Sequence, residues 1–171
     1  IKSEVTISKL TNNMYRRILD IENRLDDATF LLGARQTGKS TLLGERFADA
    51  ICFDLLNSEV RRRFQKNPEL LREMLSEKEE GTLVIIDEIP KVPDLLDEVH
   101  WLITNKGIRF VLSGSSARKL KKQSVNTLGG RAIPMYMYPL VSAEIPDFDI
   151  RRALQNGMIP RHYMVSNAQR R

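Results

Sequence analysis

Short runs of consecutive apolar residues alternate along this chain with longer segments in which apolar residues recur every three or four positions. Runs of the first kind are typical of β-strands, and segments of the second kind are typical of amphipathic helices. Their alternation predicts an α/β protein in which crossover helices cover a parallel sheet. The five predicted strands cover residues 28–32, 51–55, 82–86, 109–112 and 133–138.

The third and fourth predicted strands are expected at the centre of the sheet. Their inner runs, residues 83–86 and 110–112, contain no polar residue. Strands that are buried on both faces have continuous apolar runs of this kind, whereas half-exposed strands alternate.

Helices are predicted ahead of these strands and between them. The first covers residues 13–24, where apolar residues from Met14 to Leu25 recur at helical spacing and Thr11 or Asn12 can cap the start. It is expected to pack ahead of the sheet. The others cover residues 39–50, 58–66, a segment opening at Asn67 and Pro68, 93–107 and 117–122. After Pro139 the pattern weakens, and the polar tail over residues 160–171 is expected to fray or to lead into a further segment.

Length and composition favour one globular domain. The 171 residues are 42% hydrophobic and 29% charged, which is typical of globular chains and argues against a disordered or fibrous protein. The chain contains no apolar run near the roughly 18 residues that span a bilayer, and its start lacks the apolar stretch of a signal peptide. Cys52 is the single cysteine, which excludes an internal disulfide and argues against a zinc cage. These features favour a cytoplasmic protein without a membrane partner.

The net charge of +5 permits a partner that is rich in phosphate. Aromatic residues make up only 6% of the chain and are not interleaved with the basic clusters, as a base-stacking surface requires. Solvated helix faces therefore explain the clusters better than a nucleic-acid surface does. The clusters lie at residues 61–63, 118–122, 151–152 and 170–171.

The sequence GARQTGKS, which begins at Gly33, matches the phosphate-binding loop pattern G-x-x-x-x-G-K-[ST]. It lies between a predicted strand and a predicted helix, which is the context that this loop requires. Its backbone N–H groups and the helix N-terminus face the phosphates, Lys39 reaches the β- and γ-phosphates, and Ser40 can bind Mg²⁺. The predicted phosphate-binding residues are Gly33, Ala34, Arg35, Gln36, Thr37, Gly38, Lys39, Ser40 and Thr41.

Two acidic residues, Asp87 and Glu88, directly follow the apolar run of the third predicted strand. On their own, two acids at a strand end are a weak signal. Next to a phosphate-binding loop they supply what hydrolysis needs, namely a second anchor for Mg²⁺ and a group that acts on the attacking water. We assign Asp87 to the metal and Glu88 to the water, and the presence of Glu88 favours hydrolysis over binding alone.

The fourth predicted strand ends in the hydroxyl residues Ser113, Ser115 and Ser116. A hydroxyl at this place can sense the γ-phosphate or the attacking water, and we favour Ser115 over Ser113. The alternative is that Ser115 or Ser116 caps the following helix.

A guanidinium can stabilise the charge that develops during hydrolysis, in cis or from a neighbouring subunit. Arg131 follows a glycine pair, which allows an unusual loop beside a ligand, and is the preferred candidate. Arg118 and Arg35 are competitors, and pairing with a surface carboxylate is the alternative role for Arg131.

Several motifs, the phosphate-binding loop and the acidic pair among them, follow one another in a fixed order over nearly the whole chain. They are Tyr15-Arg16-Arg17, GARQTGKST from Gly33, the strand before Asp54, LVIIDEIPKVPDLL from Leu83, FVLSGSSARKL from Phe110, LGGRA from Leu128, Tyr138-Pro139-Leu140 with Glu144, and GMIP from Gly157. With these motifs the chain resembles the prokaryotic AAA-type ATPases in which an N-terminal ATPase domain precedes a C-terminal domain of unknown function.

The resemblance implies a three-layer P-loop NTPase fold of the AAA/ASCE type, with a central parallel five-stranded sheet in the order 5-1-4-3-2. It also implies ATP and Mg²⁺. Residues 28–145 would form the ATPase core, after a helical lead-in over 1–27, and residues 146–171 would begin a linker to the C-terminal domain. Pro90 departs from the family, which usually has glutamine there. Because the chain opens with Ile1 and stops where the second domain would begin, we expect a fragment.

The leading functional hypothesis is a Mg²⁺-dependent ATPase that drives or gates a C-terminal domain of the same chain, and the resemblance also favours a homo-oligomer. One alternative is a nucleotide-loaded switch that rarely hydrolyses ATP, and another is a DNA-associated ATPase, for which the basic clusters are the motive. A small-molecule kinase is less favoured, since no arginine-rich lid is evident apart from residues 118–122. Only the resemblance implies that the bound base is adenine and not guanine. The chain has no complete guanine-reading motif, and Asn105-Lys106-Gly107-Ile108 only half resembles one.

Overall fold

The computed structural model describes residues 15–115, 128 and 131–164. The strands are β1 (Ala28–Leu32), β2 (Ile51–Asp54), β3 (Leu83–Asp87), β4 (Arg109–Gly114) and β5 (Ala132–Tyr136). The α-helices are α1 (Lys39–Arg46), α2 (Ser58–Lys66), α3 (Leu70–Met74), α4 (Leu95–Lys106), α6 (Ile150–Asn156) and α7 (Pro160–Tyr163). The short 3-10 helices are η1 (Glu22–Arg24), η2 (Ile89–Lys91) and η3 (Ser142–Glu144). The predicted helix over residues 117–122 lies outside the described residues.

The five strands form one parallel sheet in the order β2-β3-β4-β1-β5. This is the predicted order 5-1-4-3-2 read from the other edge, so the three-layer P-loop NTPase fold is confirmed. β4 lies between β1 and β3, with Leu32 of β1 opposite Gly114 and Ile86 of β3 opposite Leu112. The carboxyl ends of β1, β3 and β4 therefore meet at one edge of the sheet.

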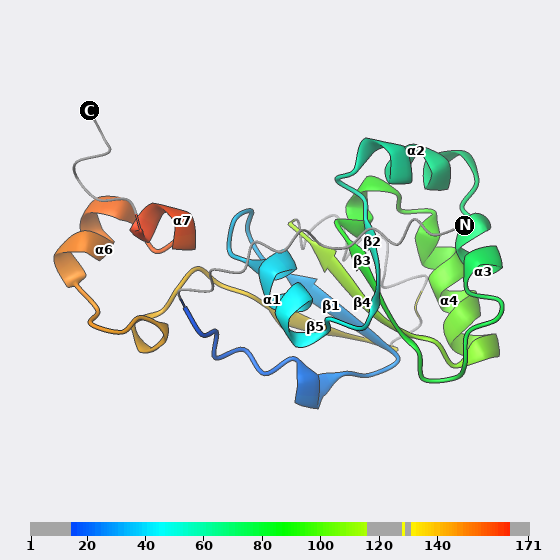
Figure 1. Ribbon diagram of the computed structural model, residues 1–171, viewed down its shortest axis with the longest axis horizontal. Coiled ribbons are helices and arrows are strands. Elements are labelled where there is room, and N and C mark those ends of the chain that lie inside the picture. Colours follow the sequence, from blue (N-terminus) through cyan, green and yellow to red (C-terminus); the bar gives the residue numbers. More distant parts are fainter. Residues whose placement is uncertain (1–14, 116–127, 129–130, 165–171) are drawn as a thin grey trace.

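Alternate residues of each strand supply the two hydrophobic cores on either side of the sheet. On β1, Phe30 and Leu32 face the larger core, which α4 and the short α2 and α3 cover, while Leu31 faces the smaller core under α1. Figure 1 shows these layers, with α1 in cyan on one face and α2, α3 and α4 in green on the other. The apolar runs of β3 and β4 are buried on both faces for this reason, as their sequences predict.

The helix boundaries follow local capping. α2 covers the predicted 58–66, because the side chain of Asn57 accepts hydrogen bonds from the backbone N–H groups of Glu59 and Val60. The predicted helix over 39–50 ends already at Arg46, where the backbone of Phe47 leaves the helical region. Asn67 caps the end of α2 instead of the start of the next helix, which begins at Leu70.

The predicted helix over residues 13–24 is wrong for its described part. Residues 16–21 form no regular secondary structure, and only the 3-10 turn Glu22–Arg24 follows. Ile21 is buried against the core under α1 while Ile18 is 65% exposed, so the two residues do not share a helical face. Side-chain and backbone contacts of Arg17 and Ile18 with distant segments, described below, stabilise this non-helical segment in place of local helical hydrogen bonds.

The segment after β5 forms a third, small core at the left of Figure 1, where α6 and α7 stand apart from the sheet. Leu140, Ile145 and Tyr163 are its buried members, and the ring of Tyr15 packs against that of Tyr163. Residues 160–163, expected to fray, are thus anchored by the burial of Tyr163. Among the described residues, none of the helices has the length and apolar character needed to cross a membrane.

Candidate functional site

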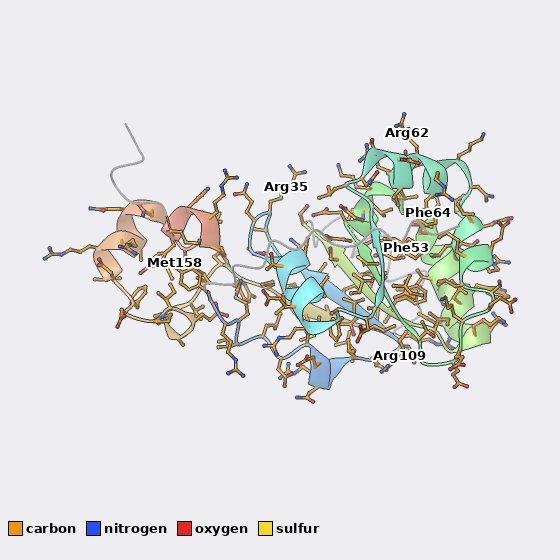
Figure 2. All side chains as sticks on the ribbon, viewed as in Figure 1. Arg35, Phe53, Arg62, Phe64, Arg109 and Met158 are labelled. Carbon is orange, nitrogen blue, oxygen red and sulfur yellow. The ribbon has the colours of Figure 1, made fainter. Side chains whose placement is uncertain are left out.

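The predicted phosphate-binding loop connects β1 to α1 at the carboxyl edge of the sheet. Gly33 allows a close backbone approach, because a Cβ atom there would lie 2.2 Å from the carbonyl oxygen of Met137. Within the loop, the Thr37 hydroxyl donates to the carbonyl oxygen of Ala34 at 2.9 Å. Arg35 is exposed at the outer side of the loop, as its label in Figure 2 indicates.

Two residues of the loop adopt positive φ angles, Gln36 at 64° and Gly38 at 95°. Glycine takes this conformation without steric cost, whereas Gln36 pays a local strain of about 1 kcal/mol or more. Such backbone conformations turn successive N–H groups toward one side and make concave anion sites. The loop has the backbone shape that a phosphate site needs.

Lys39, the first residue of α1, is 6% exposed and lies folded against the loop. Its Nζ donates to the carbonyl oxygens of Gly33 and Ala34 at 2.8 and 3.0 Å. Burial lowers the pKa of the Lys39 ammonium, while the nearby carboxylates of Glu88 and Asp87 oppose that shift. This ammonium is therefore a buried cation that a phosphate group would stabilise.

Asp87 ends β3 and is 6% exposed. The Ser40 hydroxyl donates to its Oδ2 at 2.5 Å, and the Ser113 hydroxyl of β4 donates to its Oδ1. The structure therefore brings together the two residues predicted to bind Mg²⁺. A hydroxyl oxygen and a carboxylate oxygen are both ligands that Mg²⁺ accepts, so the Ser40–Asp87 pair fits this ion.

Glu88 lies beside this pair in a left-handed conformation with φ of 57°. Its backbone N–H donates to the Ser113 hydroxyl oxygen at 3.1 Å, and its Oε2 accepts from the Ser115 hydroxyl at 3.2 Å. An acidic residue in this strained backbone region is typical of a functional position. The structure thus places Ser115, the preferred hydroxyl, directly on the carboxylate predicted to act on water.

Arg131 does not lie beside the phosphate-binding loop or the acidic pair. It directly precedes β5, whose first residue, Ala132, is opposite Ala28 at the start of β1. Its guanidinium donates to the Thr104 hydroxyl of α4 at 2.7 Å. A five-residue strand, roughly 15 Å long, separates this end of the sheet from the phosphate-binding loop. The structure does not bring Arg131 to the loop of its own chain, and Arg118 lies outside the described residues.

One contact residue of the site, Ser113, is a less favoured candidate from its sequence, and another, Arg17, is not predicted to lie at the site. Ser113 was ranked below Ser115, yet it bonds to both Asp87 and Glu88; its place at the end of a buried strand was the available signal. Arg17 donates to the Thr37 carbonyl oxygen of the loop and lines a hollow of about 290 Å³ next to it. Arg17 stands in a motif of the family resemblance, but its contact with the loop could not be predicted from that motif, because its partners lie 20 to 127 residues away.

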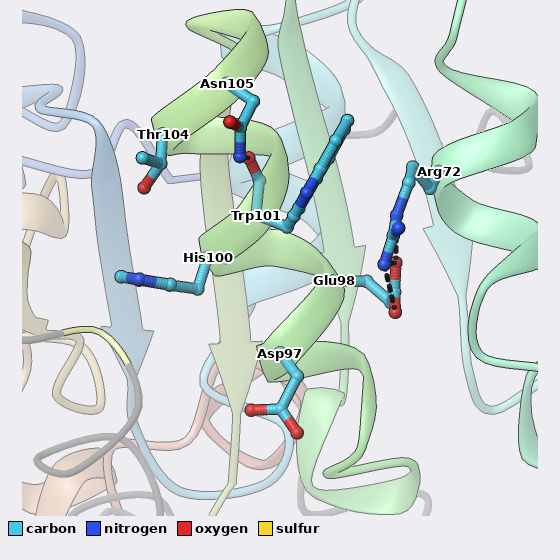
Figure 3. Close-up of a pocket in the computed structure, with 7 residues that line it drawn as sticks. All are labelled: Arg72, Asp97, Glu98, His100, Trp101, Thr104 and Asn105. Carbon is cyan, nitrogen blue, oxygen red and sulfur yellow. Dashed lines mark hydrogen bonds and ion pairs between the residues drawn. The ribbon is translucent and has the colours of Figure 1, made fainter.

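A second hollow, of about 570 Å³, lies along α4 on the opposite face of the sheet from α1. Figure 3 shows that Arg72 of α3 reaches Glu98 there, with Nε and Nη2 at 2.9 and 3.0 Å from the carboxylate oxygens. The Arg72 guanidinium also lies 4.5 Å from the centre of the Trp101 ring. These contacts hold α3 against α4. The residues that line this hollow are Arg72, Asp97, Glu98, His100, Trp101, Thr104 and Asn105, and none belongs to the predicted site.

A parallel sheet in this order, with a phosphate-binding loop after β1 and an acidic pair after β3, defines a P-loop NTPase of the AAA type. The chain belongs to the AAA domain family, whose model matches residues 26–146. No curated protein matches it by sequence.

Among solved structures, the chain is similar to the Walker-type ATPase PABY2304 of Pyrococcus abyssi. The TM-score is 0.52 at 18% identity, with 76% of this chain and 54% of that protein covered, so the chain spans about half the length of this neighbour. Two others are PCH-2 of C. elegans, with TM-score 0.46, 16% identity and coverages of 67% and 36%, and the ORC1 protein of Aeropyrum pernix in complex with DNA, with TM-score 0.47, 16% identity and coverages of 75% and 44%. At these identities the likeness concerns the fold alone.

Proposed function

We propose that the chain is a Mg²⁺-dependent ATPase domain that binds and hydrolyses ATP at the loop after β1. The observation that carries this proposal is the convergence of four residues at one edge of the sheet. The Ser40 hydroxyl is bonded to Asp87, and the Ser115 hydroxyl is bonded to Glu88. These contacts join the phosphate-binding loop, β3 and β4 into one constellation.

Each residue has a role that follows from its chemistry. The loop N–H groups and the Lys39 ammonium bind the phosphates. The phosphate oxygens then replace the loop carbonyls as the hydrogen-bond partners of that ammonium. Ser40 and Asp87 hold Mg²⁺, which when bound neutralises charge on the β- and γ-phosphates. Glu88 accepts a proton from the attacking water at a carboxylate oxygen, and Ser115 orients that carboxylate.

Arg131 has a place in this proposal only as a residue that acts on the site of a neighbouring copy. Its own loop lies at the other end of the sheet, so stabilisation of the developing charge in cis does not fit its position. Action in trans requires a homo-oligomer, for which the family resemblance is the support. The same resemblance supports a C-terminal domain as the part that the ATPase cycle drives or gates.

The test is steady-state phosphate release from ATP, measured with Mg²⁺ and again with excess EDTA, with GTP as the base control. The proposal predicts turnover that depends on Mg²⁺ and is faster with ATP than with GTP. Binding of ATP without turnover would identify the nucleotide-loaded switch instead. Absence of both binding and turnover would contradict the proposal.

A further inference from the structure

The side chain of Arg17 makes three hydrogen bonds to two distant parts of the chain. Its Nη1 donates to the Thr37 carbonyl oxygen at 2.5 Å, its Nη2 to the Tyr138 carbonyl oxygen at 2.6 Å, and its Nε to Glu144 Oε1 at 2.9 Å. Only 9% of the Arg17 side chain is exposed. One buried guanidinium thus connects the segment ahead of the sheet, the phosphate-binding loop and the segment after β5.

The partner of Arg17 is itself fully engaged. Glu144, whose side chain is 2% exposed, accepts from Arg17 Nε and the Ile18 N–H with Oε1, and from the Val141 N–H with Oε2. A buried carboxylate with three donors is costly to leave unpaired. The Arg17–Glu144 pair therefore fixes the direction in which the guanidinium presents its remaining N–H groups.

The contact with Thr37 bears on phosphate binding through the geometry of one peptide. In a planar trans peptide the carbonyl oxygen and the following N–H point in opposite directions. By holding the Thr37 carbonyl oxygen, Arg17 fixes the direction of the Gly38 N–H on the other side of that peptide. This N–H lies immediately before Lys39, among the groups that the proposed function assigns to the phosphates.

The same pair connects the loop to the third core. Glu144 belongs to η3, whose neighbours Leu140 and Ile145 pack with Tyr163 of α7. On the other side, Tyr15 lies two residues ahead of Arg17, and its ring centre is 6.2 Å from that of Tyr163. In Figure 1, the blue segment that begins at residue 15 passes beside the gold segment that leads to α6 and α7.

We propose that Arg17 is a positioning residue of the phosphate-binding loop, and that its pairing with Glu144 couples nucleotide binding to the docking of residues 140–164. The inference rests on the proposed function, because it requires that the loop binds nucleotide. Coupling of this kind is reciprocal: a docked segment raises the affinity for nucleotide, and bound nucleotide stabilises the docked segment.

The test compares Arg17→Gln with Arg16→Gln, since Arg16 is the exposed neighbour and carries the same charge. Two quantities are measured, the Kd for the nonhydrolysable analogue AMP-PNP with Mg²⁺, and hydrogen exchange of the amides over residues 150–163 with and without that ligand. Wild type and Arg16→Gln are expected to bind equally and to show slower exchange when the ligand is bound. Arg17→Gln is expected to bind at least tenfold more weakly and to show no slowing at saturating ligand.

Glu144→Gln and Arg17→Lys keep the proposal testable if Arg17→Gln does not fold. Both keep the approximate size of the side chain, but the glutamine lacks the charge and the lysine cannot reach three acceptors at once. Each is expected to lose the ligand-dependent slowing of exchange, and the double variant is expected to bind no more weakly than the weaker single one. Folded variants that bind and respond like wild type would overturn the inference while leaving the proposed function intact. Failure of wild type to bind AMP-PNP would overturn both.

Discussion

Asp87 and Glu88 are adjacent in sequence but have different surroundings, and this difference fits the separate roles proposed for them. Asp87 is buried between two hydroxyl donors, Ser40 and Ser113, which fix its carboxylate, as the proposed role of metal anchor requires. Glu88 is half-buried and receives one side-chain hydrogen bond, from Ser115. A carboxylate that must take a proton from water needs such access, whereas a metal anchor needs to be fixed.

Ser115→Ala is predicted to lower kcat by about tenfold with little change in the Kd for ATP. The substitution removes the hydroxyl that donates to Glu88 Oε2, and a hydrogen bond to a charged group contributes about 1.5 to 3 kcal/mol. Single-turnover phosphate release and equilibrium ATP binding separate the two quantities. An unchanged kcat, or a loss confined to binding, would remove Ser115 from the role of orienting Glu88.

At the scale of elements, the strands could be predicted from the sequence because buried parallel strands have continuous apolar runs, as 83–86 and 110–112 do. The positions of the loop after β1 and of the acidic pair at the end of β3 could be predicted, because both motifs occur at the carboxyl ends of strands in such a sheet. The conformation of residues 16–21 could not, since Ile18 and Ile21 have helical spacing while Arg17 makes its contacts with distant segments instead of within a helix.

The close approach of β1 and the chain after β5 leads to a prediction for Gly33→Ala. A Cβ atom at this position would lie 2.2 Å from the Met137 carbonyl oxygen, so the backbone must shift. We expect a loss of about 1 to 3 kcal/mol in the free energy of unfolding and a large loss of ATP affinity. Urea unfolding and nucleotide titration, each compared with wild type, measure these effects. Wild-type stability and affinity would show that the approach is not needed.

The thiol of Cys52 provides a test of whether β2 is buried in the folded protein. Burial raises the pKa of Cys52 to about 12, with added effect from the carboxylates of Asp87 and Asp54. Because the thiolate is the reactive form, alkylation by iodoacetamide at pH 8 is predicted to be much slower in the folded protein than in urea. The folded state keeps the thiol neutral, so this group is expected to lower stability as pH rises from about 9 toward 12. Equal alkylation rates in both states would contradict this prediction.

At the scale of the whole molecule, the two ends of the sheet are assigned different tasks. The carboxyl end holds the loop, Asp87 and Glu88, while Arg131 lies at the amino end against α4. The order of strands was predictable from the family resemblance. The distance between Arg131 and the loop was not predictable. It depends on the position of Arg131 at the start of β5, and not on the spacing of Arg131 from the motifs in the sequence.

If Arg131 acts on a neighbouring copy, an equimolar mixture of Arg131→Gln and Glu88→Gln is predicted to regain part of the turnover that each variant alone lacks. In such a mixture, the intact Glu88 of one copy meets the intact Arg131 of the other. Wild-type specific activity is also expected to rise with protein concentration. Turnover that is independent of concentration, with no recovery in the mixture, would exclude action in trans.

The proposed ATPase mechanism depends on Glu88, and its most direct test is ATP binding and turnover by Glu88→Gln beside wild type and Lys39→Ala. We predict that Glu88→Gln binds ATP with nearly wild-type affinity, while its turnover falls by about 10² to 10⁴, the usual contribution of a general base. Lys39→Ala is predicted to lose binding itself, since the buried ammonium is the cation of the loop. Wild-type turnover by Glu88→Gln would contradict the assignment of this carboxylate to the attacking water.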